Sequence, residues 1–233
     1  MKKFLITSLA VLMIGPAAHA ESVGSSFGAL MTAQSLAHGH TAIGARLGFA
    51  GTTSFVGSLG YGLSRTGDGR IKLGFVGDDL TESKLILGAD AKWQLWKAFQ
   101  ANAQGQASRT EHPFDLAIGP FIEWFKADVG SGSLASSFAV TQLGFQVVGS
   151  FPIQFKSGGS ISPYARINAR NEWISFNISA AGLPVNVSGS DSQLALGLNG
   201  GVAWRPRASP ASLYAEIQID GNSGLFLGID YPL

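Results

Sequence analysis

A two-residue alternation of apolar and polar side chains runs through most of the chain. In residues 84–96, Leu85 and Leu87 lie at odd positions, whereas Asp90 and Lys92 lie at even positions. A β-strand points successive side chains to opposite faces, so this period predicts strands with one apolar and one polar face. A helical period of about 3.6 residues would mix the two sets. The pattern recurs in residues 40–49, 54–64, 70–76, 84–96, 114–126, 142–155, 161–173, 193–205, 213–220 and 225–231.

The composition of the polar face favours a membrane barrel over a soluble barrel or sandwich. Charged residues make up 13% of the chain, about half of the ~25% usual in soluble domains, and 31 residues are glycine. A solvent face usually carries more Lys and Glu, whereas a crowded lumen needs small residues. We therefore predict an all-β fold, a transmembrane antiparallel up-and-down β-barrel of about ten strands, with eight as the alternative.

Aromatic residues at the predicted strand ends support the membrane interpretation. All five Trp fall there, as expected for aromatic girdles at membrane interfaces, whereas a soluble core would place Trp nearer the strand middles. The predicted interface aromatics are Trp93, Trp96, Trp124, Trp173, Trp204 and Tyr231.

The first twenty residues have the features of a secretory signal peptide. Lys2 and Lys3 precede an apolar run over residues 4–15, and residues 18–20 form a small-x-small cleavage site before Glu21. The run is too short for a membrane-spanning helix. We expect export through the Sec pathway to the outer membrane. The predicted organisation is a signal peptide over residues 1–20, a periplasmic lead-in over 21–37 and the barrel over 38–233.

The charge balance and the lack of cysteine exclude several classes of protein. Lys and Arg number 16 against 15 Asp and Glu, so a strongly basic nucleic-acid binder is excluded. The chain has no cysteine, which excludes a disulfide scaffold and a cysteine-ligated metal site. No cofactor and no metal are expected.

The connections predict an orientation, since membrane barrels have short periplasmic turns and longer outer loops. With both termini on the periplasmic side, tight turns fall at residues 65–69, 156–159 and 206–210, and the longest outer loop falls at 176–192. Residues 97–112 are too long for a tight turn, and we expect a short helix or a strand extension there. Pro120 and Pro163 lie within strands, where each removes a ladder hydrogen bond, so we expect bulges at both.

The inner face of the barrel is the candidate functional region. Its charges nearly cancel, and buried charges need partners because their desolvation is costly. An ion-pair network that stiffens the barrel is one interpretation, and a polar path for small solutes is the other. The charged residues of this face are Arg46, Lys72, Asp90, Lys92, Asp115, Glu123, Arg166, Arg170, Glu172, Arg205, Glu216, Asp220 and Asp230.

The size of the inner residues predicts a narrow lumen. The first four strands contribute mostly Gly, Ser and Ala, and later strands contribute large residues such as Phe121, Tyr164 and Arg166. We expect the large side chains to reach across to the small wall. About eight strands leave an interior that side chains just fill, so ten strands lie near that limit.

An enzymatic barrel would need a histidine with a Ser, Asp or Glu partner at the outer rim. The mature chain has only His38, His40 and His112, and all three fall on the predicted periplasmic side. We therefore assign no catalytic residue.

With its signal peptide, its alternating segments and its last strand, the chain resembles small Gram-negative outer-membrane β-barrel proteins. Such barrels usually end in an aromatic residue that the assembly machinery reads, and here Tyr231 lies two residues before the end. The resemblance implies contact with outer-membrane lipid and lipopolysaccharide, assembly by the barrel assembly machinery, and a monomer that binds no nucleic acid. The function expected first is a structural or narrow-pore barrel. A lipid-binding or rim-active barrel enzyme is the second alternative, and a soluble periplasmic ligand carrier the third.

Overall fold

The computed structural model describes residues 27–50, 52–77, 84–101, 107–129, 134–180, 186–220 and 223–233. The predicted signal peptide and its cleavage site lie outside these residues. Within the described ranges, no helix is long and apolar enough to cross a membrane.

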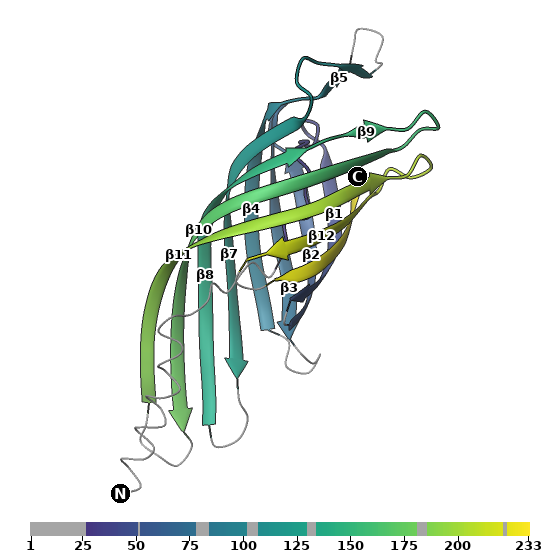
Figure 1. Cartoon of the computed structure of the whole chain (residues 1–233). Coiled ribbons are helices and arrows are strands. Elements are labelled where there is room, and N and C mark those ends of the chain that lie inside the picture. The colour runs from purple at the N-terminus through teal and green to yellow at the C-terminus, as the bar shows by residue number, and fades with distance from the viewer. Residues whose placement is uncertain are drawn as a thin grey trace, which may run out of the picture.

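Over the described residues, ten strands close into an antiparallel barrel, as the alternation predicts. The order around the ring is β1, β2, β3, β4, β7, β8, β10, β11, β12, β13, and β13 pairs again with β1 (Figure 1). The ring strands are β1 (Thr41–Ala50), β2 (Thr52–Gly62), β3 (Gly67–Gly77), β4 (Lys84–Trp96), β7 (Asp115–Val129), β8 (Leu134–Ser150), β10 (Ser160–Ala180), β11 (Asn186–Arg205), β12 (Ser212–Ile219) and β13 (Gly224–Pro232).

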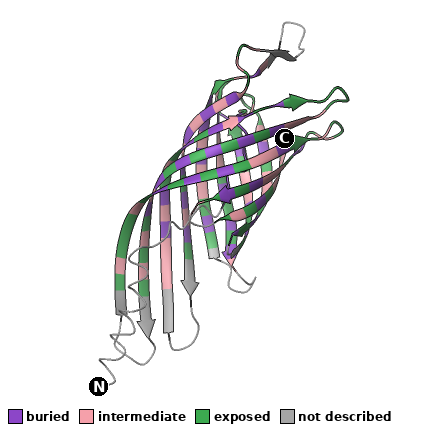
Figure 2. Ribbon diagram, viewed as in Figure 1, coloured by how far each residue is buried: buried purple, intermediate pink, exposed green. Residues whose placement is uncertain are grey.

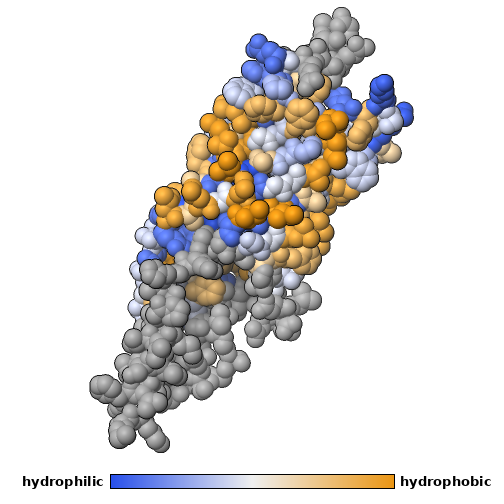
Figure 3. All heavy atoms as spheres, viewed as in Figure 1, coloured by the Kyte–Doolittle hydropathy of each residue, from blue (hydrophilic) through white to orange (hydrophobic). Residues whose placement is uncertain are grey.

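The outer surface is apolar and the lumen face is polar. Leu85, Leu87, Leu196 and Ile217 are 40%, 42%, 71% and 58% exposed, so they do not pack in an enclosed interior. Buried and exposed positions alternate along the strands (Figure 2), and apolar side chains gather over the barrel wall (Figure 3). This arrangement is the one expected of a barrel whose outside faces lipid.

At one end of the barrel, which we call the turn end, β2 connects to β3, β4 to β7, β8 to β10 and β11 to β12. The predicted contrast in connection length is wrong, because one residue separates β1 from β2 at the opposite end and 18 residues separate β4 from β7 at the turn end. The last residue, Leu233, also lies at this end, where its amide donates to the Thr41 carbonyl. We call the opposite end the loop end.

The described part of residues 97–112 forms a small projection at the turn end, which we call the extension; it is neither the short helix nor the continuation of β4 that the sequence predicts. β5 (Phe99–Ala101) and β6 (Ala107–Arg109) pair as a separate two-stranded sheet that projects beyond the barrel (Figure 1). The Thr110 amide donates to the Ala98 carbonyl at 2.9 Å and closes the base of the extension.

The prediction of a long outer loop at residues 176–192 is wrong. β10 continues to Ala180 and β11 begins at Asn186, so most of this stretch is paired strand. Ser, Asn and Gly at both faces of these residues weaken the apolar alternation, although β10 and β11 stay paired up to Ser179 and Asn186.

Neither proline produces the bulge expected of it. At Pro163 the neighbouring strand breaks at Phe151 and Pro152, and β9 (Ile153–Gln154) resumes pairing with β10 in the same register. Pro120 keeps its regular partner Phe145 in β8. The register shift lies elsewhere, between Gln94 and Trp96.

Candidate functional site in the barrel lumen

The N-terminal part of the described chain lies inside the barrel, not outside it. Residues 27–37, which we call the plug segment, belong to the predicted periplasmic lead-in. Phe27, Leu30 and Ala33 are at most 1% exposed, because barrel side chains surround them. The chain then turns at Gly39, whose amide donates to the Gly62 carbonyl, and enters β1. The sequence pattern missed this placement because the segment has little alternation.

The centre of the plug segment is held by two charged side chains through its main chain. The Glu216 carboxylate accepts hydrogen bonds from the amides of Ala29 and Leu30, at 2.6 and 2.7 Å. Arg70 donates to the carbonyls of the same two residues, at 3.1 and 3.4 Å. Successive amides that converge on one carboxylate form an anion-binding nest.

The backbone of this nest is strained. Leu30 has φ of 41° and Gly28 has φ of 62°, both in the left-handed region. A non-glycine residue in this region costs on the order of 1–3 kcal/mol and persists only where its surroundings hold it. Here the charge-assisted bonds to Glu216 and Arg70 hold Leu30 in place.

The half of the plug segment nearer the turn end is held in the same way. Lys92 Nζ donates to the carbonyls of Thr32 and Gln34, at 2.7 and 2.6 Å. The Leu36 amide donates to Asp68 at 2.7 Å. Further amide bonds run from Ala33 to Ser150, at 3.1 Å, and from Ser35 to Gln94, at 3.4 Å.

Apolar contacts seal the lumen around the plug segment. Phe27 packs with Phe125 and with inward aliphatic residues of β2, β3, β4 and β8. Leu30 packs with Ala50 and Phe226, and the small side chains of Ala29 and Ala33 pack with Ala117 and Val148. These residues face the lumen yet are apolar, so they exclude water around the segment. The aliphatic members of the Phe27 cluster are Val56, Val76, Ile86 and Val140.

The plug segment packs against the wall of small residues in the first four strands. The sequence predicts that large side chains from the opposite wall pack there. A Cβ on Gly88 would lie 3.1 Å from the Phe27 ring, and a Cβ on Gly60 would lie 3.2 Å from Leu36. Tyr164 and Phe121 pack instead against Gly201 and Gly144 of neighbouring strands. The expected reach across the lumen is therefore wrong for these two residues, because the plug segment already fills the space.

Several of the predicted lumen charges meet in buried ion pairs. Lys72 lies 2.9 Å from Asp90 and 3.6 Å from Glu123. Arg46 lies 3.0 Å from Asp230 and also donates to Ser58.

A second ion-pair group lies nearer the loop end. Arg170 contacts Glu172 at 2.8 Å and Asp220 at 3.2 Å, and all three side chains are fully buried. Gln142 and Gln193 donate to the same Glu172 carboxylate, at 3.0 and 2.9 Å.

Three predicted lumen residues have other contacts. Arg166 lies over the Phe121 ring, 4.9 Å from its centroid. Asp115 accepts from the Ala98 amide at 2.7 Å and from Gln94 at 3.2 Å. Arg205 is exposed and donates to Ser212 at 3.3 Å.

Sequence reasoning missed Arg70 and Asp68, two of the residues that hold the plug segment. Arg70 also binds Asp90 through two bonds of 3.0 Å. Both residues continue the even-numbered series of Lys72, so the alternation contained the signal. The alternation predicts a strand from residue 70 and a turn that includes Asp68, whereas β3 begins at Gly67.

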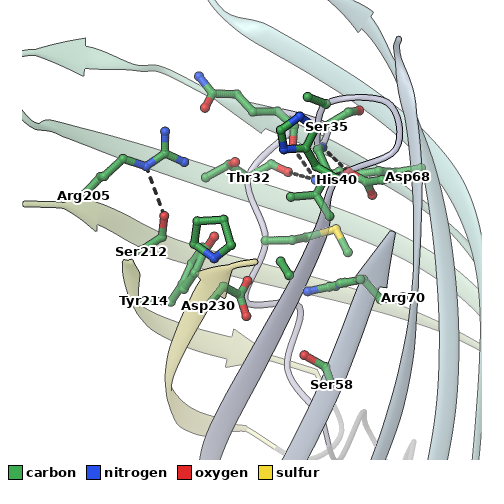
Figure 4. Close-up of a pocket in the computed structure, with 18 of the residues that line it drawn as sticks. Thr32, Ser35, His40, Ser58, Asp68, Arg70, Arg205, Ser212, Tyr214 and Asp230 are labelled. Atoms are coloured by element: carbon green, nitrogen blue, oxygen red, sulfur yellow. Dashed lines mark hydrogen bonds and ion pairs between the residues drawn. The ribbon is translucent and has the colours of Figure 1, made fainter. Parts of the chain in front are cut away.

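A cavity of about 430 Å³ lies beside the plug segment at the turn end. Figure 4 shows Arg205, Ser212 and Tyr214 on one side of it, and Asp68 and Arg70 on the other. Met31 and residues 34–37 also line it. Space therefore remains on the side of the segment that faces β11 and β12.

The predicted placement of every Trp at a strand end is wrong for Trp124 and Trp173, which lie within β7 and β10, because both strands run further than the alternation indicates. His38 and His40 lie at the turn end, and the His112 ring stacks on Trp96 with centroids 5.4 Å apart. The described residues bring together no group of three His, Asp or Glu side chains able to hold a metal ion. Of the predicted interface aromatics, Trp93, Trp96, Trp173, Trp204 and Tyr231 are 39–48% exposed, and Trp124 is half-buried. Their contact with a membrane interface stays a prediction.

Two solved structures of outer-membrane proteins are among those similar to this chain. The N-terminal β-barrel domain of Pseudomonas aeruginosa OprF is 9% identical with a TM-score of 0.33, and the match covers 85% of this chain and all of that one. The COG4313 outer membrane channel of Pseudomonas putida F1 is 14% identical with a TM-score of 0.34, over 91% of this chain and all of that one. No family model and no curated protein sequence matches. The assignment as a transmembrane β-barrel rests on the closed strand order, the apolar outer face and the polar lumen.

Proposed function

We propose that this protein is an outer-membrane barrel with a structural or narrow-pore role, closed at rest. One observation carries the proposal: the plug segment and the buried ion pairs occupy the lumen that ten strands enclose, beside a cavity of about 430 Å³ at the turn end. Wide aqueous channels need about 16–18 strands, and ten strands leave room for little more than side chains and one extended segment. We take the turn end, where Leu233 and the entry into β1 lie together, as the periplasmic end. The barrel is a monomer surrounded by outer-membrane lipid and lipopolysaccharide.

The first experiment tests the class. The mature chain, residues 21–233, is followed by cell fractionation and by gel mobility before and after heating. We expect recovery with the outer membrane and a faster band before heating, because a closed barrel resists unfolding by detergent. Recovery as a soluble protein without detergent would contradict the proposal and favour a periplasmic carrier.

The second experiment tests closure. The purified mature chain is inserted into planar bilayers and its conductance is recorded. We expect no steady current, or rare small steps, because the lumen is filled. Large steady steps of the kind that wide porins give would refute a barrel closed at rest.

A further inference from the structure

We propose that the lumen is a binding site for an extended peptide main chain, and that the plug segment is its removable occupant. The proposal rests on the function proposed above, a barrel closed at rest, and adds what opens it. When the segment leaves, a polar path through the small wall of the lumen is uncovered.

The charged side chains of the lumen bind main-chain atoms of the plug segment. Glu216, Arg70, Lys92 and Asp68 all bind amides or carbonyls of the plug segment, and each of these bonds involves a charged group. Charge-assisted bonds to peptide groups are strong and require no particular side chain. The segment contributes small side chains over most of its buried length. The site therefore suits an extended peptide with small residues, anchored at one end by an aromatic ring in the place of Phe27.

The barrel wall satisfies its own charges without the plug segment. Glu216 also accepts from Tyr164 at 2.8 Å and from Asn199 at 2.9 Å. Arg70 stays paired with Asp90, and Lys92 lies 3.7 Å from Asp68. A charge left buried and unpaired would be costly, and here removal of the segment leaves each of the three with a wall partner. This arrangement is expected of a site that exists both filled and empty.

Space for movement lies beside the segment. The cavity of about 430 Å³ separates the turn-end half of the segment from Arg205, Ser212 and Tyr214 (Figure 4). The strained φ of Leu30 is relieved when the nest opens. The segment can therefore move toward the turn end, and its release lets the Leu30 backbone leave the left-handed region.

The main experiment removes the plug segment. A variant that begins at His38 is folded, checked by heat-modifiable mobility, and compared with the mature chain in planar bilayers. We expect conductance to rise by at least about tenfold, because hydrated Gly, Ser and charged side chains then line the path. Large steady steps through the mature chain would defeat the proposed function itself. A silent mature chain with an equally silent, folded deletion variant would overturn only the plug proposal.

Added peptide tests the binding site. A synthetic peptide of residues 27–37 should block the deletion variant and restore the low conductance of the mature chain. The matched control is the same peptide with N-methyl groups on Ala29 and Leu30, which lacks the two amide donors to Glu216 and keeps every side chain. We expect it to block at least about tenfold more weakly. Equal block by both peptides, or block by neither, would overturn recognition of the main chain.

A full-length variant covers the case in which the deletion fails to fold. Glu216→Gln replaces a carboxylate that accepts two amides, and we expect it to raise the opening frequency. Ala33→Cys and Ser150→Cys are added because the Ala33 amide lies 3.1 Å from the Ser150 hydroxyl oxygen, and the chain has no cysteine of its own. Oxidised protein should stay closed and reduced protein should open. Equal conductance in the two forms would overturn the proposal.

Discussion

At the scale of single residues, several charged side chains of the lumen are buried in ion pairs. The side chains of Arg170, Glu172 and Asp220 are fully buried. Their ion pairs therefore replace the contacts with water that each charge loses on burial. A buried pair contributes little net stability over apolar residues, but removal of one partner leaves a costly charge. These residues should therefore matter more to stability than any exposed charge.

Arg170→Met tests this dependence, since it leaves two buried carboxylates without their common partner. We expect the free energy of unfolding to fall by about 3–5 kcal/mol, measured by urea titration of protein folded into lipid vesicles. Arg205→Met is the matched control, because Arg205 is exposed and bonded to Ser212. It should change stability by less than about 0.5 kcal/mol. Equal losses in the two variants would show that burial of the pair is not decisive.

Gly62→Ala tests the close approach of the plug segment to the wall. A Cβ at this position would overlap the carbonyl oxygen of Ala37, which is main chain and has little freedom to move. We expect a loss of about 1–3 kcal/mol by the same urea titration. Gly200→Ala is the control, because a Cβ there has no heavy atom within 4 Å. A neutral Gly62→Ala variant would mean that the segment is not seated against β2.

At the scale of the strands, the alternating pattern places apolar side chains on the outer face and polar side chains on the lumen face. The odd set of β3 and β4 meets lipid, whereas the even set meets the ion pairs of the lumen. Interior packing therefore does not hold the outward leucines. Leu73 and Leu63 are 54% and 52% exposed, although Leu73 lies within β3 and Leu63 follows β2 at the turn end.

Leu73→Arg and Leu63→Arg separate the effect of membrane depth from that of exposure. Arginine on the lipid face costs about 2–4 kcal/mol at the bilayer midplane and about 0–1 kcal/mol near the interface. We expect Leu73→Arg to lower the free energy of unfolding in vesicles by the larger amount and Leu63→Arg by the smaller. Similar losses at both positions would contradict a bilayer centred on the strands.

At the scale of the whole molecule, the proposed orientation rests on the turn end, where Leu233 lies beside the start of β1. The extension over β5 and β6 lies at the turn end, and the long hairpin of β10 and β11 reaches away from it at the loop end (Figure 1). Ten strands enclose more space than their inward side chains fill, and the plug segment occupies part of that remaining space.

An epitope inserted within residues 181–185 should bind antibody on intact cells, because the proposed orientation places the loop end outside. The same epitope inserted within residues 156–159 should bind only after the outer membrane is permeabilised. Recovery in the outer membrane with the reverse labelling would invert the orientation and leave the barrel itself intact.

The sequence by itself determined the barrel, its strand number and the charged character of its lumen. These features follow from local rules, because the two-residue alternation fixes which side chains share a face whatever lies opposite. The separation of Leu87 outside from Asp90 inside needed no tertiary information. The same rule places Arg70 on the even-numbered face of Lys72, and it places Asp68 there too because β3 begins at Gly67.

Only the tertiary structure decided what fills the lumen and which charges meet. Residues 27–37 carry no periodic signal, since main-chain amides and carbonyls, which every sequence has, make most of their polar contacts with the wall. The meeting of Arg170 with Asp220 likewise depends on the register across β10, β11 and β12. A local pattern assigns a side chain to a face, but it cannot assign a partner that another part of the chain brings to that face.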